Sequence, residues 1–131
     1  MIKRIGTDFL EKSRIESIFL KYGEKFTKKI LSNKEMLEFN SKKTLSKRVA
    51  YLSNNFASKE AVSKVLGTGF STGVTIKDIE ILRSKSGAPY VTIKGPADQI
   101  ADKEGLENFH VTITDTKDYS LAFAIGETRW G

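Results

Sequence analysis

The 131-residue sequence contains no cysteine, so it has no disulfide, no thiol nucleophile, no iron–sulfur cluster and no cysteine zinc site. Histidine is nearly missing as well, because His110 is the only one, and this excludes a poly-histidine metal cluster. No apolar run approaches the roughly 18 residues of a membrane-spanning helix, and no apolar signal-peptide block follows residues 1–4. We therefore expect a soluble, cytoplasmic protein that does not enter a membrane.

The length of the chain suits one compact domain. A chain of 131 residues buries roughly two-thirds of the surface that it exposes when unfolded, which is enough for a hydrophobic core without a disulfide or a structural metal. We expect a single domain over residues 1–131.

Positive charge is concentrated in the first half of the chain. Residues 1–65 contain 15 Lys and Arg against 7 Asp and Glu, whereas residues 66–131 contain 7 against 9. Such an excess favours an anionic partner, and nucleic acid, an acidic protein or a polyphosphate ligand would each satisfy it.

Local patterns predict helices in the first half and strands in the second, which is typical of an α+β fold. The apolar spacing and capping residues predict one long helix that ends at Gly67 and a shorter one that begins at Ser32-Asn33. The expected strands are residues 2–7, a hairpin of 78–83 with 90–94, and a pair of 110–114 with 119–125. The expected helices run from Asp8 to Tyr22-Gly23, from residue 33 onward, over about 46–66 and over 97–104.

Glu60 stands out on the long helix because it shares an apolar face with Val49, Leu52 and Phe56. Burying a carboxylate without a partner is costly, so Glu60 needs a cation. A surface pair with Lys64 one turn later supplies one, and a metal ion or a residue from another element are the alternatives.

Asp8 is the second candidate, at the junction of the first strand and helix. Its simplest interpretation is an N-cap, with Glu11 three residues later. A strand-end carboxylate and the helix carboxylate Glu60 would also together suit Mg²⁺, which takes one or two protein carboxylates and fills its other positions with water and phosphate oxygens. The flanking Lys59 and Lys64 would then help to neutralise a diphosphate.

The glycine-rich segment of residues 67–73 lacks both phosphate-loop patterns. Helix closure is the simpler interpretation of Gly67, and close approach to a ligand is the alternative. His110 stands at the start of an expected strand. Its simpler interpretation is a half-buried structural imidazole, and a catalytic base is the alternative.

Two motifs together carry a family resemblance: Ile5-Gly6-Thr7-Asp8, and Phe56-Ala57-Ser58-Lys59-Glu60-Ala61-Val62-Ser63-Lys64 some fifty residues later. With the matching segments 65–69, 78–81, 87–91, 110–114 and 117–119, the chain resembles from end to end the 4′-phosphopantetheinyl transferases, in the short holo-[acyl-carrier-protein] synthase type.

The resemblance implies transfer of 4′-phosphopantetheine from coenzyme A to a serine of an apo acyl carrier protein, with release of adenosine 3′,5′-bisphosphate, as a step that serves fatty-acid synthesis. It implies a Mg²⁺ requirement. It also implies a long helix on a small, mainly antiparallel sheet, assembled as a homotrimer with active sites between subunits.

The resemblance assigns the site residues by position. It implies Asp8 and Glu60 as metal ligands and Glu60 and Lys64 as the catalytic pair. The residues expected to contact coenzyme A are Lys59, Lys64, Gly67, Pro89, His110 and Thr112, and those expected to dock the acidic carrier are Arg14, Lys21 and Lys25.

Two positions depart from the family pattern. Asn55 stands where many relatives have an arginine, and Asp115 stands where many have a second histidine. Both departures concern how the 3′-phosphate of coenzyme A is held, and Lys47, Arg48 and Lys85 are the candidates to replace the missing contacts.

Two other functions remain open from the sequence. The basic isoelectric point and the lysine-rich stretches are compatible with a nucleic-acid-binding module, although no RNA-recognition aromatic signature accompanies them. A noncatalytic relative that binds coenzyme A or the carrier is the other alternative, and it would bind without turnover.

Overall fold

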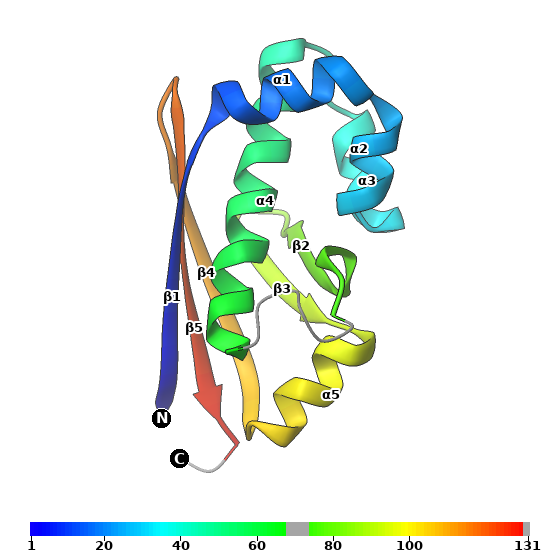
Figure 1. Cartoon of the computed structure of the whole chain (residues 1–131). Helices are drawn as coiled ribbons and strands as arrows, with labels where there is room; N and C mark the ends of the chain where they lie inside the picture. The colour runs from blue at the N-terminus through cyan, green and yellow to red at the C-terminus, as the bar shows by residue number, and fades with distance from the viewer. Residues whose placement is uncertain (68–73, 130–131) are drawn as a thin grey trace.

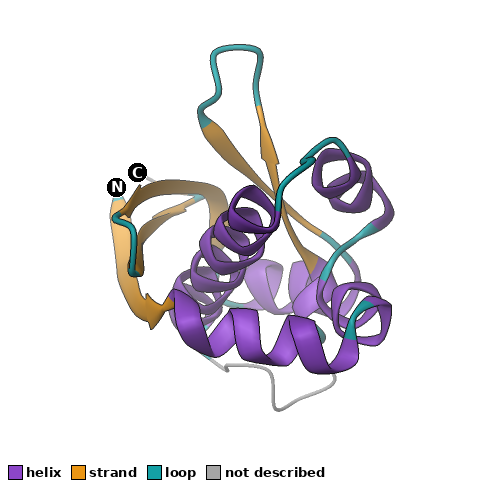
Figure 2. Cartoon of the chain, turned by 90° about the horizontal axis from the view of Figure 1, so that it is seen from above, coloured by secondary structure: helices purple, strands orange, loops and turns teal. Residues whose placement is uncertain are grey.

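In the computed structural model, which describes residues 1–67 and 74–129, one long helix, α4, lies between a three-stranded sheet and a group of smaller elements (Figure 1). Viewed from above, the helices gather on one side of that sheet (Figure 2). The elements are β1 Ile2–Glu11, α1 Lys12–Tyr22, α2 Glu24–Ile30, α3 Asn33–Asn40, α4 Leu45–Leu66, the 3-10 turn η1 Ile76–Asp78, β2 Ile79–Arg83, β3 Pro89–Ile93, α5 Gly95–Lys103, β4 Leu106–Asp115 and β5 Tyr119–Thr128.

The larger sheet is antiparallel, in the order β1-β5-β4, and β2 and β3 form a separate antiparallel hairpin. In the larger sheet Asp8 of β1 lies opposite Ala122 of β5, and His110 of β4 lies opposite Ile125. Because side chains alternate along a strand, the buried Ala122 and Ala124 mark the face that covers α4, and Asp8 shares that face. His110 points to the opposite, outward face.

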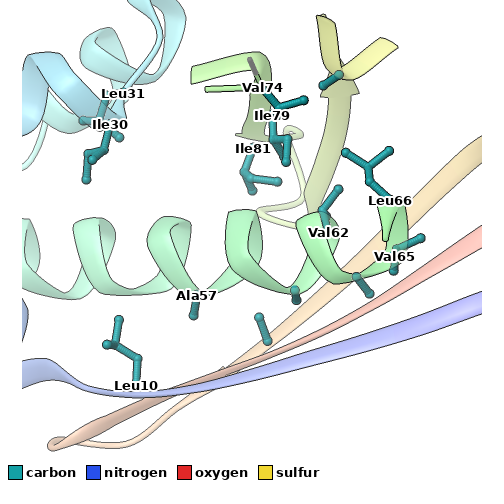
Figure 3. Packing of buried hydrophobic residues seen from close by; sticks show 14 of the residues in the cluster. Leu10, Ile30, Leu31, Ala57, Val62, Val65, Leu66, Val74, Ile79 and Ile81 are labelled. Carbon is teal, nitrogen blue, oxygen red and sulfur yellow. The ribbon is translucent and has the colours of Figure 1, made fainter. Parts of the chain in front are cut away.

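Helix α4 is buried on nearly all sides, which explains its mixed apolar pattern. Leu52, Ala57, Val62 and Leu66 are completely buried. Figure 3 shows Ala57 on the side of the helix that faces Leu10 of the sheet, and Val62 and Leu66 on the side that faces the β2–β3 hairpin. The helix ends at Gly67, whose positive φ of 86° is the left-handed closing conformation.

The structure confirms several expected elements, and the larger sheet is antiparallel, as expected for an α+β chain. The helix predicted over about 46–66 is Leu45–Leu66, and the predicted hairpin is β2–β3. Ser32 caps α3 through its side chain, in a capping box with Glu35.

One prediction was wrong, and part of another cannot be compared. Asp8 is not an N-cap, because β1 continues to Glu11 and α1 begins at Lys12. The glycine-rich segment of residues 67–73 lies outside the described residues except for Gly67. Among the described helices, none is both long and apolar enough to cross a membrane.

Candidate active site

Asp8, Glu60 and Lys64 come together where strand β1 crosses helix α4. Glu60 and Lys64 occupy successive turns of the helix, and Asp8 comes from the strand face that covers it. Gly6 permits the close approach, because a side chain there would collide with the backbone oxygen of Ala61 and lie 3.1 Å from Cβ of Lys64. The missing side chain at position 6 therefore holds the strand carboxylate near the helix carboxylate.

Lys64 bonds to the strand rather than to its helical neighbour. Its Nζ donates to the carbonyl oxygen of Thr7 at 2.6 Å and lies 3.7 Å from Oδ1 of Asp8. Glu60 forms no ion pair with another described residue, so the expected surface pair of Glu60 with Lys64 is replaced by a pair of Asp8 with Lys64.

The two carboxylates lie close enough to affect each other, and nearby cations do not offset the effect of burial on their pKa values. Burial raises the pKa of Asp8 above its ordinary value, which Lys64 and Arg14 oppose. Burial also raises the pKa of Glu60, and the negative charge of Asp8 raises it further, against the effect of Lys64. Two carboxylates that each resist ionisation form a site that a cation would stabilise.

The donor set fits Mg²⁺ in particular. No group of three or more His, Cys, Asp or Glu side chains gathers within residues 1–67 and 74–129, so a metal that needs a complete protein cage has no place there. Mg²⁺ is commonly bound by one or two carboxylates together with water and substrate phosphate oxygens. Asp8 and Glu60 match that requirement.

A hollow of about 960 Å³ opens beside Glu60, between α1, α2 and η1. Its wall is largely apolar, with Ile18, Phe26 and Phe56, and Lys25 and Lys77 are among its lining residues. Lys25 therefore borders the same hollow as Glu60, and Arg14 is close enough to Asp8 to lower its pKa. Lys21 lies on α1 with its ammonium 5.2 Å from the ring centre of Tyr22.

Lys59 does not belong to this site, which corrects its expected role as a phosphate ligand. Its side chain is completely buried, and its Nζ donates to Oε1 of Glu35 at 2.7 Å and to the carbonyl oxygens of Ile76 and Ile79. All three protons of the ammonium are engaged, so none is left for a ligand. Burial lowers the pKa of Lys59, and the charge of Glu35 opposes that effect.

Glu35, which the sequence analysis did not single out, is the centre of this buried network. Its Oε2 accepts hydrogen bonds from Nδ2 of Asn55 at 3.1 Å and from the backbone N–H of Ile81 at 3.0 Å. The carboxylate thus joins α3, α4 and β2, and position 55 belongs to the core. The only local sequence signal at Glu35 was its place in a capping box, three residues after Ser32. That pattern predicts the start of a helix, and it does not indicate a partner for Lys59.

The other expected coenzyme A residues lie apart from Asp8 and Glu60 within one chain. Pro89 begins β3 on the hairpin, and Gly67 closes α4 one turn after Lys64. His110 and Thr112 lie on the outward face of β4, where Nε2 of His110 is 2.6 Å from Oε1 of Glu127. One chain brings together the expected metal and catalytic residues but not all of the expected substrate contacts.

Comparisons with known proteins agree in sequence and in structure. A family model described as the 4′-phosphopantetheinyl transferase superfamily matches residues 4–124. A holo-[acyl-carrier-protein] synthase of Vibrio cholerae serotype O1 is 39% identical over 129 residues, covering 98% of this chain and 100% of the relative.

Two solved structures share the fold over nearly the whole length. The holo-[acyl-carrier-protein] synthase of Neisseria meningitidis has a TM-score of 0.86 at 34% identity, covering 98% of this chain and 100% of that one. The enzyme of the same name from Helicobacter pylori, crystallised in complex with coenzyme A, has a TM-score of 0.80 at 25% identity, covering 95% and 100%.

Proposed function

This chain belongs to the 4′-phosphopantetheinyl transferase superfamily. We propose that its reaction depends on Mg²⁺ and that Asp8 and Glu60 hold the ion. The chain is a holo-[acyl-carrier-protein] synthase, which transfers the 4′-phosphopantetheine group of coenzyme A to an acyl carrier protein. The observation that carries the metal proposal is the half-buried carboxylate pair, in which burial and then the charge of Asp8 raise the pKa of Glu60. We also take residues 1–131 as a single transferase domain, since the family match spans most of them.

Bound Mg²⁺ would supply positive charge to a coenzyme A diphosphate and stabilise the charge that develops there during transfer. Lys64 would add its ammonium from the same place, because it reaches Asp8 and the backbone of Thr7 on one side and is half-exposed on the other. The two carboxylates and the lysine thus form a receptor for a dianionic diphosphate.

Glu60 is the proposed base. In the reaction the serine oxygen of the carrier bonds to the β-phosphorus, the bond from that phosphorus to the bridging oxygen breaks, and adenosine 3′,5′-bisphosphate leaves with the electron pair. Glu60, directly or through a water molecule, accepts the serine proton. Its raised pKa brings its basicity closer to neutral pH, which favours general-base catalysis.

The carrier docks, in this proposal, on α1 and the start of α2. Arg14, Lys21 and Lys25 present positive charge there. Arg14 acts to lower the pKa of Asp8 and Lys25 lines the hollow beside Glu60, which supports this surface. An acidic carrier bound to this surface would bring its serine toward the carboxylate pair.

Assembly as a homotrimer explains why the remaining substrate contacts lie elsewhere in one chain. The outward face of the larger sheet exposes Ile5 at 61%, Phe9 at 65% and Leu121 at 40%, and an apolar face of that kind suits contact with another copy. His110 and Thr112 lie on this same face, so they would reach coenzyme A held by the Asp8 and Glu60 of a neighbouring subunit.

The metal proposal is tested by measuring transfer rates against Mg²⁺ concentration for the wild type, Asp8→Asn and Glu60→Gln. We expect Asp8→Asn to need at least about tenfold more Mg²⁺ and Glu60→Gln to lose most of its rate at every concentration. Asp98→Asn, which alters an exposed carboxylate on α5, is the matched control and should behave as wild type. Unchanged Mg²⁺ dependence in Asp8→Asn would refute the assignment.

The assembly proposal is tested by light scattering after size separation. We expect the wild type at three times its chain mass of 14.6 kDa and Phe9→Asp at a smaller mass. A wild-type protein that elutes as a monomer would refute it.

A further inference from the structure

One wall of the hollow beside Glu60 is held in place by a side chain from the core. Residues 74–77, which include the start of the 3-10 turn η1, line the hollow and form this η1 wall. The turn is three residues long, and its own backbone adds a hydrogen bond from the N–H of Asp78 to the carbonyl oxygen of Thr75 at 2.9 Å. Hydrogen-bond geometry in short 3-10 turns is poor, so contacts from other elements must fix the wall.

Lys59 supplies such a contact at both ends of the turn. Its Nζ donates to the carbonyl oxygen of Ile76, the first residue of η1, at 3.1 Å and to that of Ile79, directly after η1, at 2.7 Å. Its third proton goes to Oε1 of Glu35 at 2.7 Å. One ammonium group therefore ties the η1 wall to α4 and, through Glu35, to α3.

The carboxylate of Glu35 is itself fixed by three elements. Its Oε1 also accepts a hydrogen bond from the backbone N–H of Ser32, at the start of α3, at 2.8 Å. Its Oε2 accepts from Asn55 of α4 and from the backbone N–H of Ile81 of β2. Both members of the ion pair are completely buried. Since the carboxylate has one position, the ammonium of Lys59 that it holds has one position as well.

Stability alone does not account for such a pair. Both charges lose their hydration on burial, and apolar side chains of the same volume often stabilise a core as well or better. The ammonium adds direction, because it fixes the carbonyl oxygens to which it donates, and an apolar side chain cannot. Glu60, the next residue along α4, lies about 100° around the helix from Lys59 and lines the hollow. Lys59 thus fixes the η1 wall relative to the helical turn that carries Glu60.

We propose that Lys59, held by Glu35, is a positioning residue for the acyl carrier protein, because it sets the η1 wall of the hollow that the carrier meets beside Glu60. The inference rests on the proposed function, in which the carrier docks on α1 and the start of α2. Residues of α1, α2 and η1 line the same hollow, so a carrier bound to the first two elements also meets the third. The exposed Lys77 adds a cation to the η1 wall, which suits an acidic carrier.

The test measures transfer kinetics in the full-length enzyme with each substrate varied in turn. The double variant Lys59→Met/Glu35→Gln removes both buried charges together. We expect its KM for the carrier to rise at least about fivefold, and its KM for coenzyme A to change less than about twofold. A purely structural role would lower the fraction of folded enzyme, and hence the apparent kcat, but would leave both KM values unchanged.

The control is a destabilising change away from the η1 wall. Leu106→Ala removes a buried side chain at the start of β4, and Leu106 is not among the residues that line the hollow. This variant should have a lower Tm than the wild type and an unchanged KM for both substrates.

A second variant loosens the η1 wall and leaves the buried ion pair in place. Oδ2 of Asp78 accepts a hydrogen bond from the N–H of Thr75 at 3.0 Å and closes the turn. Asp78→Ala removes this bond and should also raise the KM for the carrier, at least about threefold, whereas Asp78→Asn keeps an acceptor oxygen and should stay close to wild type. If the double variant does not fold, Asp78→Ala decides, and an unchanged KM for the carrier would then overturn the proposal.

Hydrogen exchange of residues 74–82 is measured in parallel. The N–H of Ile79 donates to the carbonyl oxygen of Ile76, which Lys59 also binds, so we expect this amide to exchange at least about tenfold faster in the double variant than in Leu106→Ala. An unchanged KM for the carrier in a folded double variant, or an equal rise in KM for both substrates, would overturn the proposal. A wild-type enzyme that modifies no carrier would instead refute the proposed function.

Discussion

Replacing Gly6 by alanine should separate the two carboxylates of the active site without unfolding the chain. The new Cβ would overlap the backbone oxygen of Ala61 and lie 3.1 Å from Cβ of Lys64, 3.3 Å from the carbonyl carbon of Ala61. Backbone atoms cannot rotate away, so β1 must move off α4 by on the order of 1 Å to reach normal contact distances. Asp8, two residues along the strand on the same face, moves with it.

The cost to stability is moderate and the cost to catalysis is large. Overpacking of this kind costs about 1–3 kcal/mol, which corresponds to a fall in Tm of roughly 4–11 °C for a chain of this length. A 1 Å misplacement of catalytic groups lowers a rate by about 100-fold. We expect Gly6→Ala to remain folded at 25 °C and to transfer phosphopantetheine about 100 times more slowly.

The assay needs a control that is destabilised to a similar extent elsewhere. Gly126 serves, because a Cβ there would overlap Cγ1 of Val65 and lie 3.1 Å from Cδ2 of Leu106. It lies opposite Arg4, four residues along β1 from Asp8. Gly126→Ala should lower the Tm and keep a kcat within a few-fold of wild type. If Gly6→Ala keeps full activity, the close approach at Gly6 does not position Asp8, and the reasoning is wrong.

Three further changes probe other parts of the molecule. Lys59→Met leaves Glu35 as an unpaired buried charge and should lower the free energy of unfolding by about 3–5 kcal/mol, as measured by urea unfolding. Adding Glu35→Gln to this variant should restore part of the loss. No loss of stability in Lys59→Met would contradict the buried pair. Burial raises the pKa of Glu60, so the charged carboxylate destabilises the folded state at high pH, and this effect vanishes as the pH falls below the ordinary pKa of a glutamate. The Tm of Glu60→Gln should therefore be a few degrees above that of the wild type at pH 7.5 and equal to it at pH 4. A lower Tm than wild type at pH 7.5 would contradict the burial of a charged Glu60. Arg14→Glu should raise the KM for the carrier at least tenfold and that for coenzyme A less than twofold, and equal changes would refute docking at α1.

Local sequence patterns predicted the elements whose causes are local. Helix α4 was predictable because it has no internal Gly or Pro and ends at a glycine that takes a positive φ. The cap of α3 was predictable because Ser32 and Glu35 satisfy each other within one turn.

The features that depend on distant partners were not predictable in this way. Strand β1 passes through Asp8 because it pairs with β5, more than a hundred residues later. Lys59 was expected beside Glu60, at a phosphate, but its partner Glu35 lies 24 residues earlier, on another helix. Helical spacing identified Glu60 as a carboxylate that needs a cation, and the family resemblance paired it with Asp8. The structure shows how: β1 continues past Asp8 and crosses α4 there.

The most direct test of the account is intact-protein mass spectrometry of an apo acyl carrier protein after incubation with this enzyme and coenzyme A, with Mg²⁺ in one sample and EDTA in another. We expect the carrier to gain one phosphopantetheine group with Mg²⁺, to gain none with EDTA, and to gain none when Glu60→Gln replaces the wild type. Transfer that continues in EDTA, or a folded enzyme that modifies no carrier, would contradict the assignment of a metal-dependent transferase centred on Asp8 and Glu60.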